Sequence, residues 1–459
     1  MKKIFRKIHL WLSVPFGLII AIICFSGAML VFETEIQEWS HPARYFVEEV
    51  KEEPIPVGRL MRSVSAQLPD TLSISGVQIP NNPKRNYRMS FTGQNRMAAL
   101  YVDPYTGDIR DLQLGAQKNF FTVMRQLHRW LMGSFKRDGS FSLGKTVVGI
   151  STLLFVFVLI SGIIIWIPKT KKALLLRLKI KLKYGWRRFW HDLHVAGGIY
   201  AVLLLLAMSL TGLTYSFSWY RNGFYRVFGA DIPQMGYHGG APASQAAAKA
   251  EYSESVDDNQ DAATGDAPRE GRGNRGGGRP EYTGENRREG RGGGRPENAD
   301  TTYEGRGNRG SRRPENVGDT PREGRSGRGG GYQVGGGNVN YRQWQTVIDQ
   351  LKTQYPRHKS MTIQDGRVSV ALSGMISGRA SDSYIFDAQT GDITESTYYK
   401  DANKSGKMRG WIYAVHVGSW GGITTRILSF LAALLGTALP LTGYYMWIRR
   451  LLSRKRNRQ

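Results

Sequence analysis

Cysteine is almost absent from this sequence, since Cys24 is the only one in 459 residues. An internal disulfide is therefore excluded, and no cluster of thiolates can bind a metal ion. A dinucleotide-binding fingerprint is absent as well, because no G-x-G-x-x-G follows an expected strand and opens a helix. The sequence thus predicts no dinucleotide site of that kind.

Charged residues are missing from four long stretches, at residues 10–32, 147–167, 195–217 and 427–448. Each stretch is close to the roughly 20 apolar residues that a helix needs to cross a bilayer. The first stretch is too long for the apolar region of a usual signal peptide, and three more stretches follow it. The sequence therefore predicts an α-helical protein that crosses the lipid bilayer four times.

Acidic residues are scarce beside these stretches, whereas basic residues are abundant. The chain has 63 Lys and Arg residues against 37 Asp and Glu residues, which gives a net charge of +26. The basic residues gather before the first stretch, between the second and third, and after the fourth. The positive-inside rule then places both termini and the short link in the cytoplasm. The loops at about 33–146 and 218–426 are expected in the periplasm of a bacterial inner membrane, and no nucleic-acid partner is expected.

The two long loops share a short motif. "YVDPYTGDI" at residues 101–109 and "IFDAQTGDI" at residues 385–393 have D-x-x-T-G-D-I in common. A β-prone run leads into Asp, then into a turn with Gly, then into another run, which predicts a β-hairpin. Short helices are expected upstream, near residues 57–68 and 342–355. Each loop is therefore expected to hold a small α+β unit.

The apolar stretches repeat as well. His9 precedes Gly27 by 18 residues, and His194 precedes Gly212 by the same interval. The second and fourth stretches end alike, in "SGIIIWI" and "TGYYMWI". We therefore predict a four-helix transmembrane bundle that arose by internal duplication, with a pseudo-two-fold axis along the membrane normal. Two extracytoplasmic α+β domains complete the predicted fold.

A Gly/Arg-rich insert at residues 239–337 interrupts the second outer domain. Large apolar residues are nearly absent from it, so it cannot bury enough surface to offset the entropy of ordering, and we predict disorder. The predicted segments are the N-terminus and first span (1–32), a periplasmic α+β domain (33–119), a histidine-bearing interfacial helix and second span (120–167), a basic cytoplasmic link (168–189), the third span (190–220), a second periplasmic α+β domain with the insert (221–410), a histidine-bearing segment and fourth span (411–448), and a basic cytoplasmic tail (449–459).

Eight histidines divide into two groups. Three of them, His41, His238 and His358, lie in polar loops and are interpreted as surface residues without a special role. The other five stand at the entrances of spans: His9, His128, His191, His194 and His416.

Four of these five are repeat equivalents. Under the duplication His9 corresponds to His194, and His128 corresponds to His416. A pseudo-two-fold axis brings such equivalents toward each other, as two axial ligands of a haem iron require. Zinc would need more ligands. Histidines that merely sit among headgroups and an intramembrane proton relay are the alternatives, but the span interiors hold no acid or base to continue a relay.

Neighbouring basic residues could contact the propionates of such a cofactor. The spacing to Gly212 selects His194 over His191 as a ligand, so His191 is a candidate propionate contact one turn away. The other candidates share only their position near a span entrance: Arg6, Arg125, Arg129 and Arg187.

Taken together, "RKIHLWLSVPFGLI", "QLHRWLMG", "DLHVAGGIY" and "AVHVGSWGG" resemble the PepSY-associated transmembrane helix family, and the D-x-x-T-G-D-I hairpins resemble PepSY domains. The family resembles inner-membrane iron-uptake proteins, including ferric-siderophore reductases with two b-type haems. The resemblance implies His9 with His194, and His128 with His416, as bis-histidine ligands of two haems b. Val195 departs from the pattern, which commonly has a basic or polar residue there, and the pattern does not include the insert.

The resemblance further implies an oxidoreductase that reduces a ferric siderophore or another ferric chelate in the periplasm. Quinol or a cytoplasmic reductant would supply the electrons. Two alternatives stay open at this point. One is a non-enzymatic PepSY envelope protein that binds or regulates a protease or another partner, and the other is a permease for an iron chelate or haem.

Overall fold

The computed structural model describes residues 2–69, 72–92, 98–113, 119–133, 142–232, 341–364, 366–376 and 378–456. The predicted insert at 239–337 lies outside these residues, as does His238.

Four helical stretches are long and apolar enough to cross a membrane, within the part of the chain that the structure describes. The first is α1 (Lys2–Leu30), the second is α6 (Leu143–Trp166), and the fourth lies almost entirely in α14 (Gly422–Arg456). The third runs through α8 (Trp186–Asp192), a π-helical turn η2 (Leu193–Gly197) and α9 (Gly198–Ser216). These helices confirm a multi-pass membrane protein, because each coincides with one of the uncharged stretches of the sequence.

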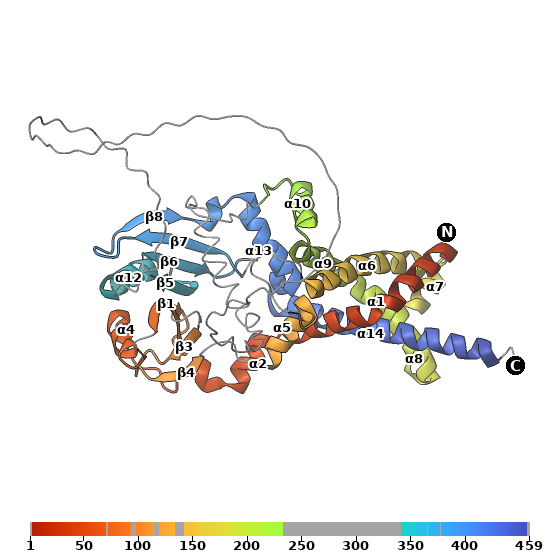
Figure 1. Cartoon of the computed structure of the whole chain (residues 1–459), viewed down its shortest axis with the longest axis horizontal. Coiled ribbons are helices and arrows are strands. Elements are labelled where there is room, and N and C mark those ends of the chain that lie inside the picture. Colours follow the sequence, from red (N-terminus) through yellow and green to blue (C-terminus); the bar gives the residue numbers. More distant parts are fainter. Residues whose placement is uncertain are drawn as a thin grey trace, which may run out of the picture. The chain divides into compact units, whose positions relative to one another are not determined.

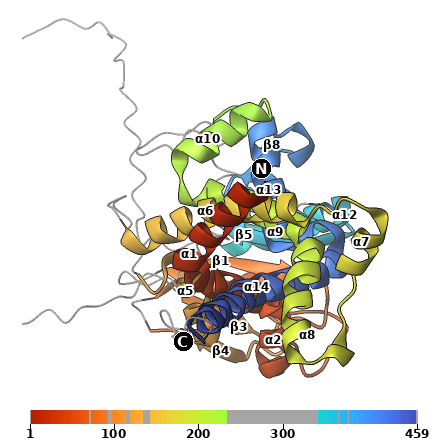
Figure 2. The ribbon, with the colours of Figure 1, turned by 90° about the vertical axis from the view of Figure 1, so that its right-hand side faces the viewer.

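The spans form one bundle, seen end-on in Figure 2, in which α1 lies against α6 and α14, and α9 lies against the same two helices. Its interior is apolar and includes Ile20, Phe155 and Leu205. A β-carbon at Gly436 would lie 3.0 Å from the Cys24 sulfur, so this glycine permits close approach of α14 to α1. Large apolar side chains such as Leu203 point outward instead, where the lipid bilayer covers them.

The remaining helices are short. Before the second and fourth spans stand α5 (Phe120–Trp130) and α13 (Lys404–Val417), each capped by an asparagine side chain that accepts a backbone N–H bond. The others are α2 (Glu33–Ser40), α3 (Pro42–Tyr45), α4 (Val57–Ser65), α7 (Lys171–Arg177), η1 (Leu182–Tyr184), α10 (Ser218–Val227), η4 (Tyr341–Gln343), α12 (Trp344–Gln354), η5 (Tyr399–Asp401) and η6 (Ser419–Gly421).

Eight strands form a single antiparallel sheet in the order β4-β3-β2-β1-β5-β6-β7-β8 (Figure 1). The first loop supplies β1 (Ser73–Pro80), β2 (Tyr87–Thr92), β3 (Ala98–Val102) and β4 (Ile109–Gln113), and the second supplies β5 (His358–Gln364), β6 (Arg367–Leu372), β7 (Ser381–Phe386) and β8 (Ile393–Thr397).

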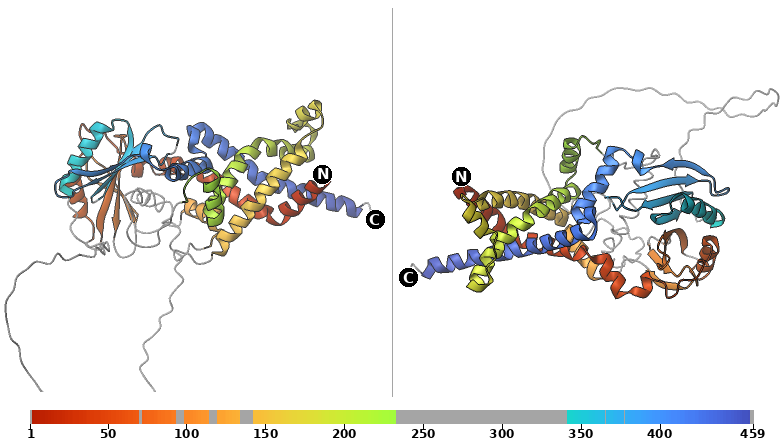
Figure 3. Two further views of the ribbon diagram at one scale, coloured as in Figure 1. Left: turned by 90° about the horizontal axis from the view of Figure 1, so that it is seen from above. Right: turned by 180° about the vertical axis from the view of Figure 1, so that it is seen from behind.

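The two loops therefore meet at the pair β1–β5, with Gly76 opposite Gln364. Helices α4 and α12 contact each other and pack on this sheet, burying Leu60 and Trp344 completely (Figure 3). This buried core joins the two α+β units that the sequence was interpreted to contain separately. The sequence predicts the helices and hairpins, but it does not predict their fusion into one sheet.

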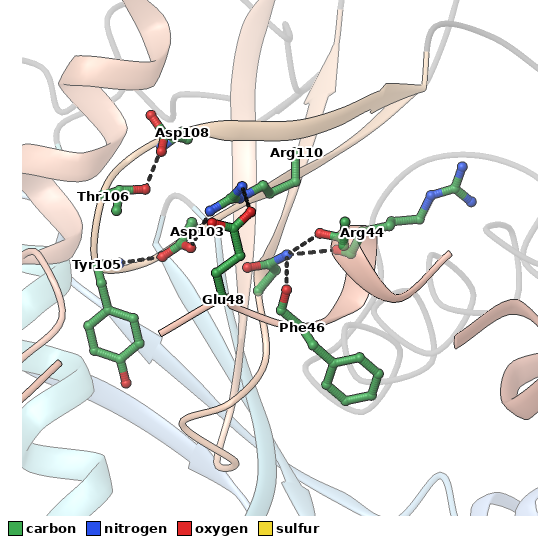
Figure 4. Close-up of polar contacts among 10 residues, drawn as sticks. Arg44, Phe46, Glu48, Asp103, Tyr105, Thr106, Asp108 and Arg110 are labelled. Carbon is green, nitrogen blue, oxygen red and sulfur yellow. Dashed lines mark hydrogen bonds and ion pairs between the residues drawn. The ribbon is translucent and has the colours of Figure 1, made fainter. Parts of the chain in front are cut away.

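Both D-x-x-T-G-D-I motifs form the tight turn of a hairpin, β3–β4 and β7–β8, as predicted. The Asp103 carboxylate accepts the backbone N–H of Tyr105 at 2.9 Å (Figure 4), and Asp387 accepts those of Gln389 and Thr390 at 2.7 and 3.0 Å. The motif glycine has a positive φ in both turns, +80° and +83°, which explains why glycine stands there. The shared motif is thus a structural device.

The first of these turns is tied to neighbouring charges. Arg110 donates to Asp103 at 2.9 Å and to Glu48 at 2.8 Å, and all three side chains converge in Figure 4. The position equivalent to Arg110 in the second hairpin, one residue after the motif isoleucine, is Thr394.

One expectation about histidine is wrong. His358 does not lie in a polar loop but opens β5, and it is only 5% exposed. Its ring donates from Nδ1 to the Tyr355 carbonyl at 2.7 Å. The sequence suggested a polar loop because the charged residues Arg357 and Lys359 stand on either side of His358.

Candidate functional site

Two pairs of histidines face each other in the helical part of the molecule. His9 on α1 and His194 on η2 have ring centroids 6.4 Å apart and are called the first pair. His128 on α5 and His416 on α13 have ring centroids 6.0 Å apart and are called the second pair. The structure thus brings together the same two pairs that the repeat spacing predicts.

Each ring of the first pair is anchored on a neighbouring span. The Nδ1 of His9 lies 3.1 Å from the Val158 carbonyl oxygen and 3.0 Å from the Ser161 hydroxyl. The Nδ1 of His194 lies 3.1 Å from the Leu439 carbonyl oxygen and 2.9 Å from the Thr442 hydroxyl. Because a carbonyl only accepts, Nδ1 carries the proton in both rings.

The second pair uses the same anchor. His128 donates from Nδ1 to the Ile23 carbonyl on α1 at 2.9 Å, and His416 donates to the Met208 carbonyl on α9 at 2.9 Å. The Thr211 hydroxyl is farther from the His416 ring, at 3.4 Å. Each of the four spans therefore receives one imidazole.

The anchoring carbonyl always belongs to the third residue before a serine or threonine. That hydroxyl donates to the same carbonyl, at 2.9 Å from Ser161, 2.9 Å from Thr442, 3.1 Å from Thr211 and 3.1 Å from Ser26. Side-chain bonds of this type within a helix add a second donor to one carbonyl oxygen. The [ST]-G pair of each span is therefore the receiving position for one histidine.

The glycine of the pair leaves room for the ring. A β-carbon at Gly27 would lie 2.8 Å from His128 Cε1, and one at Gly212 would lie 3.0 Å from His416 Cε1. In the first pair the corresponding separations, at Gly162 and Gly443, are 3.5 and 3.7 Å. The second pair therefore lies closer to its glycines than the first pair does.

With the proton fixed on Nδ1, the lone pair of Nε2 is available in all four rings. Among the described residues, the hydrogen bonds of these rings are made by Nδ1 and none is made by Nε2. A second-shell bond at one imidazole nitrogen is the usual way to aim the other at a metal. The described residues include no cluster of three or more His, Cys, Asp or Glu side chains that could bind a metal ion.

The second pair lies outside the spans, on α5 and α13. Burial lowers the pKa of both His128 and His416, and the positive charge of Arg129 acts in the same direction. Both rings are therefore neutral at physiological pH, which is the form that can donate a lone pair.

The other candidate residues are dispersed. His191 is half exposed and lies 3.3 Å from the buried carboxylate of Asp192, which Arg188 also binds at 2.9 Å. Arg6 and Arg187 are exposed. Their contact with a cofactor stays a prediction.

The two candidates near the second pair are more enclosed. Arg125 is buried and forms an ion pair with Glu33 at 2.7 Å. Arg129 stacks over Trp130 at 5.7 Å from the ring centroid and acts on both second-pair rings.

Sequence reasoning missed several contributors to the site. The hydroxyls of the spans appear in the sequence as part of the repeated [ST]-G pairs. The sequence does not tell that each of these pairs lies beside a histidine of another helix. Tyr215 lies 5.7 Å from His416, and Arg379 lies 3.5 Å over the Tyr413 ring. The π-helical turn at His194 also has no signature in sequence, although such turns often mark functional sites.

These features define a four-span membrane protein with a composite antiparallel sheet and two facing histidine pairs in its helical part. The family model described as the PepSY-associated TM region matches residues 6–450, and the chain belongs to that family. No curated protein matches the chain.

Proposed function

We propose that this protein carries electrons across the membrane through two bis-histidine haems b and reduces ferric iron, bound to a siderophore or another chelator. The observation that supports this most strongly is the pair of facing imidazoles at each of two levels, every one anchored through Nδ1. These Nδ1 bonds fix the orientation of each ring, as ligation through the other nitrogen requires.

The donor set fits haem iron. An imidazole nitrogen bonds a first-row metal at about 2 Å, so two imidazoles on opposite sides of one iron have centroids about 6 Å apart. The observed separations are 6.4 and 6.0 Å. When bound, haem would supply a one-electron Fe(III)/Fe(II) couple. His9 and His194 would hold one haem, and His128 and His416 the other.

The two sites divide the crossing into shorter steps. His9 and Gly27, which receives His128, are 18 residues apart on α1, roughly 27 Å along a helix. The apolar core between them, which includes Ile20 and Leu205, keeps water out of the intervening space. A matched arrangement at both levels supports an internal duplication of the chain.

Orientation follows from charge. The link between the second and third spans contains nine Lys and Arg residues and no acidic residue between 168 and 189. The positive-inside rule places this link and both termini in the cytoplasm of an inner membrane, and the sheet in the periplasm. Quinol or a cytoplasmic reductant would then deliver single electrons to the first pair.

The reaction transfers one electron to each chelated ion, so that Fe(III) becomes Fe(II) and the donor is oxidised by one equivalent. Oxygen-rich chelators hold the harder Fe(III) better than Fe(II), so reduction weakens their hold. The two histidines of each pair would hold the haem iron between them, which would leave no open position on the iron for oxygen.

The test is haem quantification on purified protein by the pyridine haemochrome method. We expect about two haems per chain, falling to about one in His194→Ala and in His416→Ala. His41→Ala is the control, because it removes an exposed imidazole at the end of α2, outside the candidate cofactor contacts, and should leave the stoichiometry unchanged. A colourless, folded protein would instead favour the non-enzymatic PepSY role, and uptake of chelate into vesicles without reduction would favour a permease.

A further inference from the structure

We propose that the hydroxyls of Ser161 and Thr442 hold the first pair at a lower reduction potential than the second pair, so that electrons pass from the first pair to the second. This inference rests on the proposed function, and it assigns the direction of transfer to named side chains. Ser161 and Thr442 are positioning residues, since they act through the imidazoles and not on the iron.

The two pairs differ in what surrounds Nδ1. In the first pair a carbonyl and a hydroxyl lie within 3.1 Å of each Nδ1. In the second pair the carbonyl lies at 2.9 Å for both rings, but the Thr211 hydroxyl is at 3.4 Å. The Ser26 hydroxyl donates to the Ile22 and Ile23 carbonyls at 2.7 and 3.1 Å. Among the described residues, each first-pair ring therefore has two acceptors within 3.1 Å of Nδ1, whereas each second-pair ring has its carbonyl at 2.9 Å as the acceptor within that distance.

The hydroxyl can act only as an acceptor from the ring. Its own proton is already donated to the carbonyl, at 2.9 Å from both Ser161 and Thr442. The Nδ1 proton is therefore shared between two oxygens. Stronger withdrawal of that proton raises the basicity of Nε2, and a more basic axial ligand stabilises Fe(III) over Fe(II). The result is a lower potential at the first pair.

Charge acts in the same sense at the second pair. Arg129 follows His128 directly on α5, and its guanidinium lies over the Trp130 ring at 5.7 Å from the centroid. A nearby cation favours the reduced state, which has one positive charge fewer. Near the first pair, the Arg188 guanidinium is neutralised by Asp192 at 2.9 Å, and Arg187 is exposed, so solvent screens its charge.

The experiment is a spectroelectrochemical titration of the holoprotein in detergent, after haem stoichiometry has been established. His194→Ala and His416→Ala each leave one component, which assigns the two potentials. The Ser161→Ala/Thr442→Val double variant should raise the first-pair potential. A tenfold change in the reduced-to-oxidised ratio at fixed applied potential, equivalent to about 59 mV, is the expected size.

Matched controls separate this effect from simple loss of packing. Ser26→Ala/Thr211→Val removes the equivalent hydroxyls of the second pair, where the Thr211 hydroxyl is 3.4 Å from His416 Nδ1 and Ser26 donates to the Ile22 and Ile23 carbonyls, and should shift that potential much less. Ser161→Thr retains a hydroxyl and should keep the wild-type value. If the double variant loses haem, Ser161→Ala alone gives the same comparison with half the perturbation.

The outcomes are distinct. A first-pair potential below that of the second pair, raised only by loss of Ser161 and Thr442 hydroxyls, supports the proposal. Equal potentials, a reversed order, or equal shifts in both double variants overturn it and leave two-haem binding intact. Failure to bind two haems overturns the proposed function itself, and with it this inference.

Discussion

At the residue scale, the distance between an imidazole and the glycine beneath it distinguishes the two pairs. The Cε1 atom of His128 lies so near Gly27 that a β-carbon there would approach it to 2.8 Å, whereas His9 leaves 3.5 Å above Gly162. The first distance is shorter than side-chain carbons tolerate, and the second is ordinary van der Waals contact. A methyl group is therefore a sharp probe of each site.

We expect Gly27→Ala to displace the His128 ring and to lower the haem content from about two to about one, at a steric cost of about 1–3 kcal/mol. Gly162→Ala is the matched control at the equivalent [ST]-G pair, and it should retain both haems. Haem quantification and thermal unfolding on both variants make the comparison. Retention of both haems in Gly27→Ala would show that the ring is not held where the structure places it.

Part of the candidate site could be predicted from the residue types. The histidines and the [ST]-G pairs are visible in sequence, and their spacing predicts which rings meet. The carbonyls of Val158, Leu439, Ile23 and Met208 carry no residue-specific signal, so the anchors could not be predicted. The ligand roles themselves stay a prediction until a cofactor is measured.

At the scale of elements, one ion pair ties the helix after the first span to the last span. Arg426 on α14 donates to Glu35 on α2, with 2.8 Å between Nη2 and Oε2, and also to the Val31 carbonyl. The hydrogen bond from Arg426 lowers the pKa of Glu35 below its ordinary value of 4.5, although partial burial opposes the shift. The bond therefore links α2 to α14 only while Glu35 is ionised.

The sign of the pH dependence follows. A carboxyl whose pKa is lower in the folded state contributes stability that is complete above its unfolded pKa and is lost as the pH falls through the folded value. We expect Glu35→Gln to lower the unfolding temperature at pH 7 and to differ less from the wild type below about pH 4.5. Because Glu35 is 46% exposed, solvent screening limits the effect to less than about 1 kcal/mol.

Thermal unfolding in detergent between about pH 3 and pH 7 measures this, because these values bracket the ordinary glutamate pKa of 4.5. Glu53→Gln is the control, because Glu53 is exposed in the loop between α3 and α4. A Glu35→Gln difference that stays constant with pH would contradict the assignment.

Helices and strands were predicted well where a single feature of the sequence determines them. Uncharged stretches of spanning length gave the four spans, and the D-x-x-T-G-D-I turns gave two hairpins. The β1–β5 pairing was not predictable from the sequence. Both strands alternate between buried and exposed side chains, and this alternation does not specify which strand pairs with which. The 5% exposure of His358 follows from that same sheet, which polar flanking residues conceal in sequence.

At the scale of the whole molecule, the direction of the proposed electron transfer depends on which side of the membrane each pair faces. The first pair lies near the N-terminus of α1 and beside the basic link, whereas the second pair lies at the opposite ends of α1 and α9. If the link were outside, the gradient inferred for the two pairs would carry electrons inward. The membrane topology is therefore the measurement that connects the site to the proposed iron reduction.

The near absence of cysteine makes that measurement direct. In a Cys24→Ala background, Glu53→Cys reports the first long loop and Lys172→Cys reports the basic link, both at exposed positions. We expect a membrane-impermeant maleimide to label Glu53→Cys in intact spheroplasts and Lys172→Cys only after lysis. The reason is that nine basic residues without a compensating acid oppose translocation of the link. Labelling in the opposite pattern would reverse the orientation. The proposed electron transfer would then run toward the cytoplasm, and the proposed reduction of an iron chelate in the periplasm would be contradicted.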